Sequence, residues 1–117
     1  MKEFFLIPLI LLLTSCGTSG DTSGVKVIVG AQLDPGHDRP HLDHSVVVIR
    51  DGRFESVGPQ QSTPVPKGAQ ITSGMGKLIT PIASTSVVAS GEPANLVLRD
   101  AATNSAEKVM HDGEWLK

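Results

Sequence analysis

Ser45–Val57 reads SVVVIRDGRFESV, and this stretch decides the fold. Its first half is a continuous run of β-branched residues, which favour strands, and such a run indicates a strand buried on both faces. Asp51-Gly52 follows, and then comes Arg53–Val57, an imperfectly alternating second run. Asp-Gly between apolar runs is a strong hairpin signal, because a type I′ turn needs positive φ at both central residues. The stretch therefore predicts a β-hairpin.

The same pattern recurs near the C-terminus, where Asp112-Gly113 separates Glu107–His111 from Glu114–Leu116. No window shows sustained helical spacing of apolar residues with caps, so we expect helix to be at most minor. The chain therefore predicts an all-β fold, a small sandwich or barrel of about seven or eight short strands. The remaining strand candidates are Val25–Val29, Gln70–Thr72, Lys77–Ile79 and Asn95–Leu98.

The N-terminus has the features of a signal peptide, which we assign to residues 1–15. Its apolar run, Phe4–Leu13, is shorter than the roughly 20 residues that a membrane-spanning helix needs. Leu13–Gly17 resembles a bacterial lipobox, which implies cleavage before Cys16 and lipidation of its thiol. Residues 16–24 are rich in Gly and Ser, as flexible tethers are. The alternative is an ordinary secretory signal with an incidental cysteine.

A lipid anchor at Cys16 implies attachment to a membrane of the bacterial cell envelope. Gly17 stands where lipoproteins retained at the inner membrane often have Asp, which favours an outer-membrane or periplasm-facing location. Cys16 is the only cysteine, so the domain expected over residues 25–117 has no internal disulfide and depends on burial. The net charge of −2 and the lack of a Lys/Arg run argue against nucleic acid as a partner.

Six fragments of the chain lie in one collinear order: Val27–Asp34, Val47–Gly58, Val65–Ile71, Gly76–Pro81, Gly91–Leu98 and Lys108–Trp115. Together they resemble one enzyme family, the metal-dependent amidohydrolases. In that family the two end segments of the chain pair into a β-sandwich beside a catalytic (β/α)₈ barrel. The resemblance implies that this chain keeps the composite sandwich domain. The first four fragments precede the position of the barrel, and the last two follow it.

The departures from the family concern its catalytic parts. Only Ile82–Ser90 lies between the two groups of fragments, whereas a (β/α)₈ barrel needs roughly 200 residues or more. In the family, the proline matching Pro81 leads to a metal-binding His-x-His pair, but Ile82–Val88 contains no histidine. The other metal ligands, the bridging lysine and the catalytic aspartate belong to barrel strands. We therefore expect no enzyme activity and assign no catalytic residue.

Asp34–His44 is the one stretch that could carry site chemistry, since it holds three histidines and three aspartates. Zn²⁺ takes imidazole nitrogen and carboxylate oxygen, so we consider His37, Asp38, His41 and His44 as candidate ligands. The prolines and glycine of the stretch predict a loop between strands. We therefore expect a solvated polar connection and assign no cofactor, with zinc at these four residues as the alternative.

These observations favour a non-catalytic, membrane-tethered sandwich that acts in binding or assembly. Without the barrel, the side of the sandwich that the barrel covers in the family would be left bare. A large exposed apolar patch is rare on monomers, so this side would bind a protein partner, bind a second copy or have become polar. Two alternatives remain: an accessory subunit of a metal-dependent amidohydrolase acting on C–N bonds, or a degenerate remnant of one.

Overall fold

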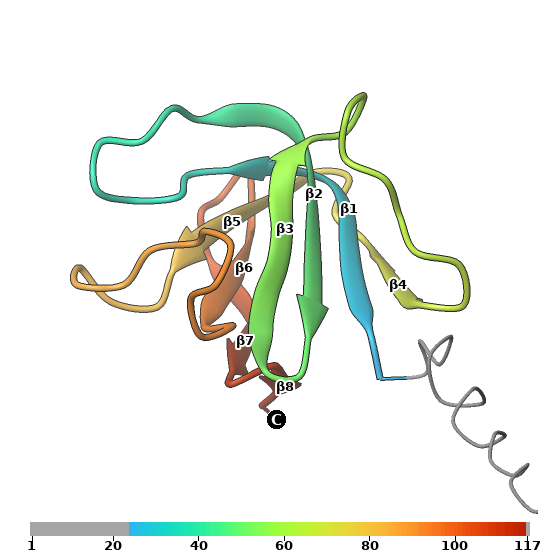
Figure 1. The fold of residues 1–117 in the computed structure, drawn as a ribbon. Coiled ribbons are helices and arrows are strands. Elements are labelled where there is room, and N and C mark those ends of the chain that lie inside the picture. Colours follow the sequence, from blue (N-terminus) through green and yellow to red (C-terminus); the bar gives the residue numbers. More distant parts are fainter. Residues whose placement is uncertain (1–23, 117) are drawn as a thin grey trace, which may run out of the picture.

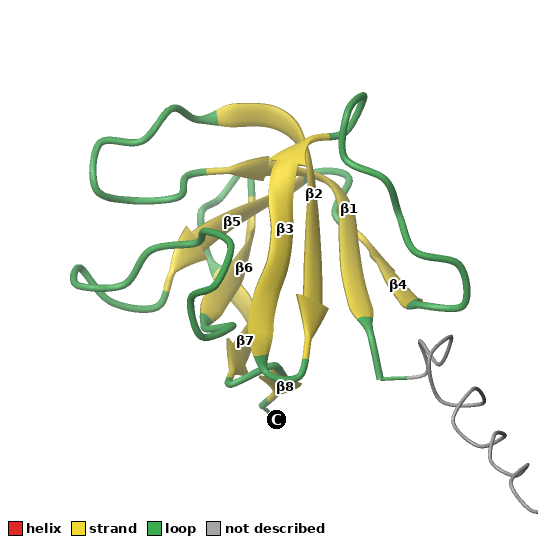
Figure 2. Ribbon diagram, in the orientation of Figure 1, coloured by secondary structure: helices red, strands yellow, loops and turns green. Residues whose placement is uncertain are grey.

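The computed structural model describes residues 24–116, and these form an all-β fold with no helix (Figure 2). Eight strands follow one another along the chain, which confirms the predicted fold class. The strands are β1 (Lys26–Leu33), β2 (Leu42–Arg50), β3 (Arg53–Pro59), β4 (Gln70–Ser73), β5 (Lys77–Pro81), β6 (Leu96–Asp100), β7 (Ala106–His111) and β8 (Glu114–Trp115).

All eight strands belong to one mixed sheet in the order β3-β2-β1-β5-β6-β7-β8, with β4 also paired to β1 (Figure 1). β1 has two successive partners on one side. Its first half, Lys26–Val29, pairs in parallel with β4, whereas Gln32 and Leu33 pair in parallel with β5. The change of partner falls at Gly30, which has φ +92° and lies within a β-bulge against β2. A bulge bends its strand, so β1 can serve both partners.

The two end segments of the chain join directly. β5 and β6 form an antiparallel ladder from Lys77↔Asp100 to Pro81↔Leu96, although Ile82–Asn95 separates them in sequence. The sheet also curls, so that β3 reaches the segment that precedes β6. The backbone N–H of Phe54 donates to the carbonyl of Glu92 at 2.9 Å across this contact. The result is a single curled sheet that combines both segments, as the sequence predicts.

The curled sheet encloses one main core. Phe54 of β3, Leu96 of β6 and Met110 of β7 contribute to it from distant parts of the sequence, and each is at most 1% exposed. A smaller cluster on the other face of β1 and β2 contains Val27 and Val48. Because β2 supplies both clusters, its residues 46–49 are all buried, which confirms the predicted burial on both faces.

Both Asp-Gly turns have the predicted backbone conformation. The φ angles are +55° and +78° at Asp51 and Gly52, and +49° and +84° at Asp112 and Gly113. The two turns also touch each other: a Cβ atom on Gly113 would lie only 2.8 Å from the Cα atom of Gly52. Glycine at this contact lets the two backbones approach closely.

The structure corrects one local prediction. The sequence places all of Asp34–His44 on a loop, but β2 begins at Leu42, so Asp43 and His44 lie on a strand. The reason is that β1 extends to Leu33, which pairs with Leu42 beyond two irregularities in the ladder. The paired strands therefore continue into the polar stretch.

The predicted signal peptide (residues 1–15), the lipidation site Cys16 and most of the tether lie outside the described residues. Gly24, the last residue assigned to the tether, is an exposed turn residue. Over the described range, 24–116, no helix is long and apolar enough to cross a membrane.

Candidate functional site

The connection between β1 and β2 is organised around Asp34. The backbone N–H of Asp34 donates to the carbonyl of Ile79 at 2.9 Å, which ties the end of β1 to β5. Its Oδ1 atom accepts a hydrogen bond from the N–H of Gly36 at 3.1 Å and lies 3.2 Å from Nε2 of His41. Asp34 therefore serves the local turn and contacts one histidine.

The other candidate metal ligands do not join this pair. His37 and Asp38 are exposed and adopt positive φ angles of +53° and +59°. His44 is exposed on β2, where its backbone carbonyl accepts a hydrogen bond from Gln60. Within residues 24–116 no three His, Cys, Asp or Glu side chains come together as a metal site requires. Zinc binding by this stretch stays the alternative to a solvated connection, and it would need the loop to rearrange.

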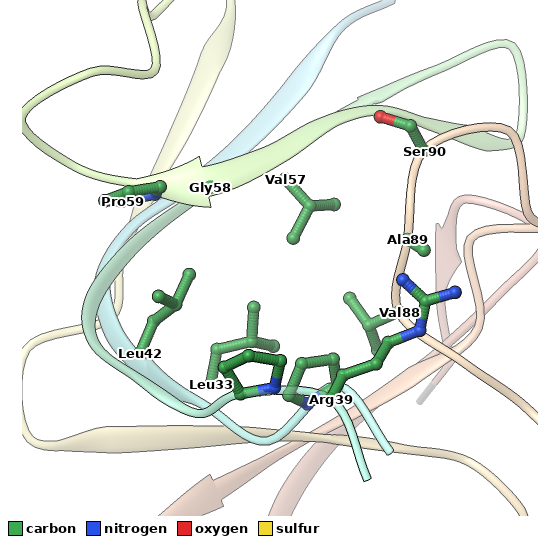
Figure 3. A pocket seen from close by; sticks show the side chains of 11 residues that line it. Leu33, Arg39, Leu42, Val57, Gly58, Pro59, Val88, Ala89 and Ser90 are labelled. Carbon is green, nitrogen blue, oxygen red and sulfur yellow. The ribbon is translucent and has the colours of Figure 1, made fainter. Parts of the chain in front are cut away.

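A pocket lies beside this loop, where β1 ends, β2 begins and β3 ends (Figure 3). Its volume is about 380 Å³, within the range of small-molecule sites. Figure 3 shows the side chains of Leu33, Leu42, Val57 and Val88 directed toward the same space. We call this cavity the end pocket; it is lined by Leu33, Pro35, Arg39, Pro40, Leu42, Val57, Gly58, Pro59, Val88, Ala89 and Ser90.

The connection Ile82–Ser90 forms one wall of the end pocket and is fastened on both sides. The N–H of Val88 donates to the carbonyl of Pro35 at 3.0 Å, and the Ser90 hydroxyl donates to the carbonyl of Glu55 at 3.0 Å. Val88 and Leu33 are each 1% exposed and belong to the main core. The base of the pocket is therefore continuous with the core of the domain.

Arg39 is the one charged residue that lines the end pocket. Figure 3 shows its side chain extended along the pocket, with the guanidinium group toward Ala89. Its backbone N–H bonds to Gly36 at 3.1 Å, but the guanidinium makes no ion pair or hydrogen bond with any residue of the described range. Arginine is a strong donor to carboxylates and phosphates, so this group is available to an anion.

Sequence reasoning missed the end pocket. It considered the stretch around Arg39 for its histidines, and it treated Ile82–Ser90 only as a short link. No local pattern could reveal the pocket, because its walls come from three segments that the topology brings together. These are Leu33–Leu42, which runs from the end of β1 to the start of β2, then Val57–Pro59 and Val88–Ser90.

Within the described residues, three ionisable groups outside the end pocket have shifted pKa values, those of Arg50, Lys77 and Asp100. A hydrogen bond from Arg50 to Glu55 raises the pKa of the guanidinium, and one from Lys77 to Glu107 raises the pKa of that amine. Backbone N–H groups of Thr103 and Ala102 lower the pKa of the Asp100 carboxyl. Perturbed groups can mark functional sites, but these three are only partly buried and lie outside the end pocket. Lys77 and Asp100 face each other across β5 and β6, and each contributes to the pKa shift of the other.

A second, polar cavity of about 540 Å³ lies at the Asp-Gly turns and includes Asp51, Arg53, Asp112 and Glu114. The Arg53 guanidinium donates to the carbonyl of Gly91 at 2.9 Å, so it fastens the chain before β6. The three carboxylates of this cavity, on Asp51, Asp112 and Glu114, do not form a candidate metal site in the described part of the chain. We therefore treat the end pocket as the candidate site.

The described residues form a small all-β domain that carries a largely apolar pocket at one end. No family model matches the chain, and no curated protein matches it. Among solved structures, molinate hydrolase is similar over 49% of this chain, with 30% identity and a TM-score of 0.45. Phenylurea hydrolase B is similar over 49%, with 31% identity and a TM-score of 0.44. A putative prolidase from Bifidobacterium longum is similar over 52%, with 24% identity and a TM-score of 0.46.

These similarities are partial on both sides. The matched region spans 12% of the molinate hydrolase chain, 12% of the phenylurea hydrolase B chain and 16% of the prolidase chain. About half of this chain thus corresponds to a small part of each of these larger hydrolases.

Proposed function

We propose that this chain is a lipid-anchored, non-catalytic module of the bacterial cell envelope, related to the composite domain of amidohydrolases and acting in binding or assembly. One observation carries the proposal: β5 and β6 join the two end segments into a single core, with only Ile82–Ser90 between them. A catalytic barrel would need roughly 200 residues at this position.

The short connection also indicates where a partner would dock. Ile82–Ser90 crosses the end of the domain that carries the end pocket, and Ile82 itself is 36% exposed. In the amidohydrolases that this sequence resembles, the barrel leaves the sandwich at the equivalent position. We therefore place the docking side at this end and assign the membrane attachment to Cys16.

Affinity purification of the full chain from its own membranes, followed by mass spectrometry, tests this function. We expect a protein partner or a second copy to be recovered, and we expect Ile82→Asp to reduce that recovery. Leu116→Asp is the matched control, because Leu116 is also exposed, at 53%, and does not line the end pocket. Recovery of the chain alone would contradict an assembly role.

The alternative of an accessory subunit predicts a different result from the same experiment. A co-purifying barrel protein with metal-dependent hydrolase activity would make this chain part of an enzyme and overturn the non-catalytic proposal. The anchor is tested separately by Cys16→Ser, which should move the chain from the membrane fraction to the soluble fraction. An unchanged membrane fraction would contradict lipid attachment at Cys16.

A further inference from the structure

The end pocket combines two properties that together specify a ligand. Its base is apolar and continuous with the core, through Leu33 and Val88. Its one charged lining residue is Arg39, and no Asp or Glu lines it. A ligand that fills it should therefore be apolar at one end and negatively charged at the other.

We propose that the end pocket binds a small amphipathic anion, a carboxylate on an aliphatic tail. The tail lies between Val57 and Val88, and the carboxylate meets the guanidinium of Arg39. Aliphatic burial supplies most of the affinity, at roughly 25 cal/mol per Å² of apolar surface removed from water. The guanidinium supplies selectivity for anions, because its planar donors match a carboxylate.

The pocket is formed in advance of binding. Its loop wall is fastened by the hydrogen bonds from Gly36 to Asp34 and from Val88 to Pro35. The opposite wall is the end of β3, where Val57 pairs with Val47 of β2. A pre-formed site does not lose free energy in ordering its walls, so a small ligand can bind without rearrangement of the sheet.

The negative charge of the ligand follows from what surrounds Arg39. The guanidinium has no partner in the described part of the chain, whereas the partly buried Arg50 pairs with Glu55 at 2.8 Å. A carboxylate at Arg39 would therefore gain a charge-assisted hydrogen bond without displacing an existing one. An amine of equal length would meet only repulsion from the guanidinium.

Titration of the full chain with octanoate, in lipid nanodiscs and followed by methyl NMR, tests the proposal. We expect the methyl resonances of Val57 and Val88 to shift with saturation, and octylamine at the same concentrations to leave them unchanged. Arg39 is exposed, so Arg39→Gln should weaken octanoate binding about twofold to fivefold, which is the effect of losing one exposed charged contact. Arg50→Gln is the matched control and should leave the affinity unchanged.

A second variant tests the apolar cavity while leaving the charge of Arg39 in place. Ala89→Leu places a larger side chain at the pocket wall and should abolish octanoate binding, whereas Ala106→Leu on β7 should not. Circular dichroism and the melting temperature of each variant show that it is folded. Because these measurements use the purified chain alone, they can fail without affecting the proposed docking role.

Three results would overturn the inference. The first is no shift of Val57 or Val88 with octanoate, and the second is equal binding of octanoate and octylamine. The third is a shift of these resonances with protein concentration but not with octanoate, which would assign the pocket to a second copy of the chain.

Discussion

The two ends of β3 are closed in different ways. At its start, the Asp51-Gly52 and Asp112-Gly113 turns meet backbone to backbone, and Phe54 follows directly into the core. At its end, Val57–Pro59 borders the end pocket, and Val57 is only half-buried. The first end is packed by main-chain contact, whereas the second leaves about 380 Å³ beside apolar side chains. The tightly packed turns and the proposed binding pocket thus lie at opposite ends of one strand.

This difference predicts where substitutions affect stability. The largest loss is expected for Phe54→Ala, because Phe54 is 1% exposed and its removal leaves a cavity in the main core. We expect the free energy of unfolding to fall by about 3–5 kcal/mol. Urea denaturation followed by the fluorescence of Trp115, the single tryptophan, measures this.

Val57→Ala is the matched control on the same strand. Its side chain is half-buried at the pocket, so its truncation should cost only about 1 kcal/mol. Equal losses at Phe54 and Val57 would show that the two ends are packed alike and would remove the contrast between them.

The contact between the two Asp-Gly turns is tested by Gly113→Ala. The added Cβ would meet Gly52 at 2.8 Å, and alanine disfavours the φ angle of +84°. We expect a loss of about 2–4 kcal/mol in unfolding free energy, again from urea denaturation.

Gly76→Ala measures the cost of backbone strain alone, without a steric contact such as the one between Gly113 and Gly52. Gly76 has a similar φ angle of +75°, but nothing lies within 4 Å of the added Cβ. It should therefore cost only the strain of about 1 kcal/mol. If Gly113→Ala cost no more than Gly76→Ala, the close approach of the turns would contribute nothing to stability.

The smallest effect is expected at the turn between β6 and β7, which is stabilised by a carboxylate. The N–H groups of Thr103 and Ala102 donate to Oδ1 of Asp100 at 3.0 and 2.8 Å and lower the pKa of this carboxyl below its ordinary value of 3.8. The resulting stabilisation is fully present above that ordinary value and is lost as the pH falls through the lowered pKa.

Asp100→Asn removes the titrating group while keeping an acceptor oxygen. We expect the variant to be slightly less stable than the parent at pH 7, with the difference shrinking as the pH falls through the lowered pKa. Urea midpoints measured across this pH series test it. A difference that stays constant with pH would assign the effect of Asp100 to turn geometry alone.

Local sequence was sufficient for the strands and the hairpins. The run of β-branched residues before Asp51 predicted a strand buried on both faces, and residues 46–49 are buried. Each Asp-Gly pair predicted a turn with positive φ at both positions, because that preference is a property of the two residues themselves. The resemblance also predicted that both end segments share one domain, and β5 pairs with β6.

Other features were decided by the tertiary structure, because they depend on residues far apart in the chain. The parallel partners of β1 follow from the bend at Gly30 and from the return of β4 and β5 along the same edge. The end pocket needs Val57 and Val88 to line the same space, and Arg39 to line it with no Asp or Glu among the other lining residues. No local pattern encodes these contacts between distant residues, because they form only when the strands pair and the sheet closes.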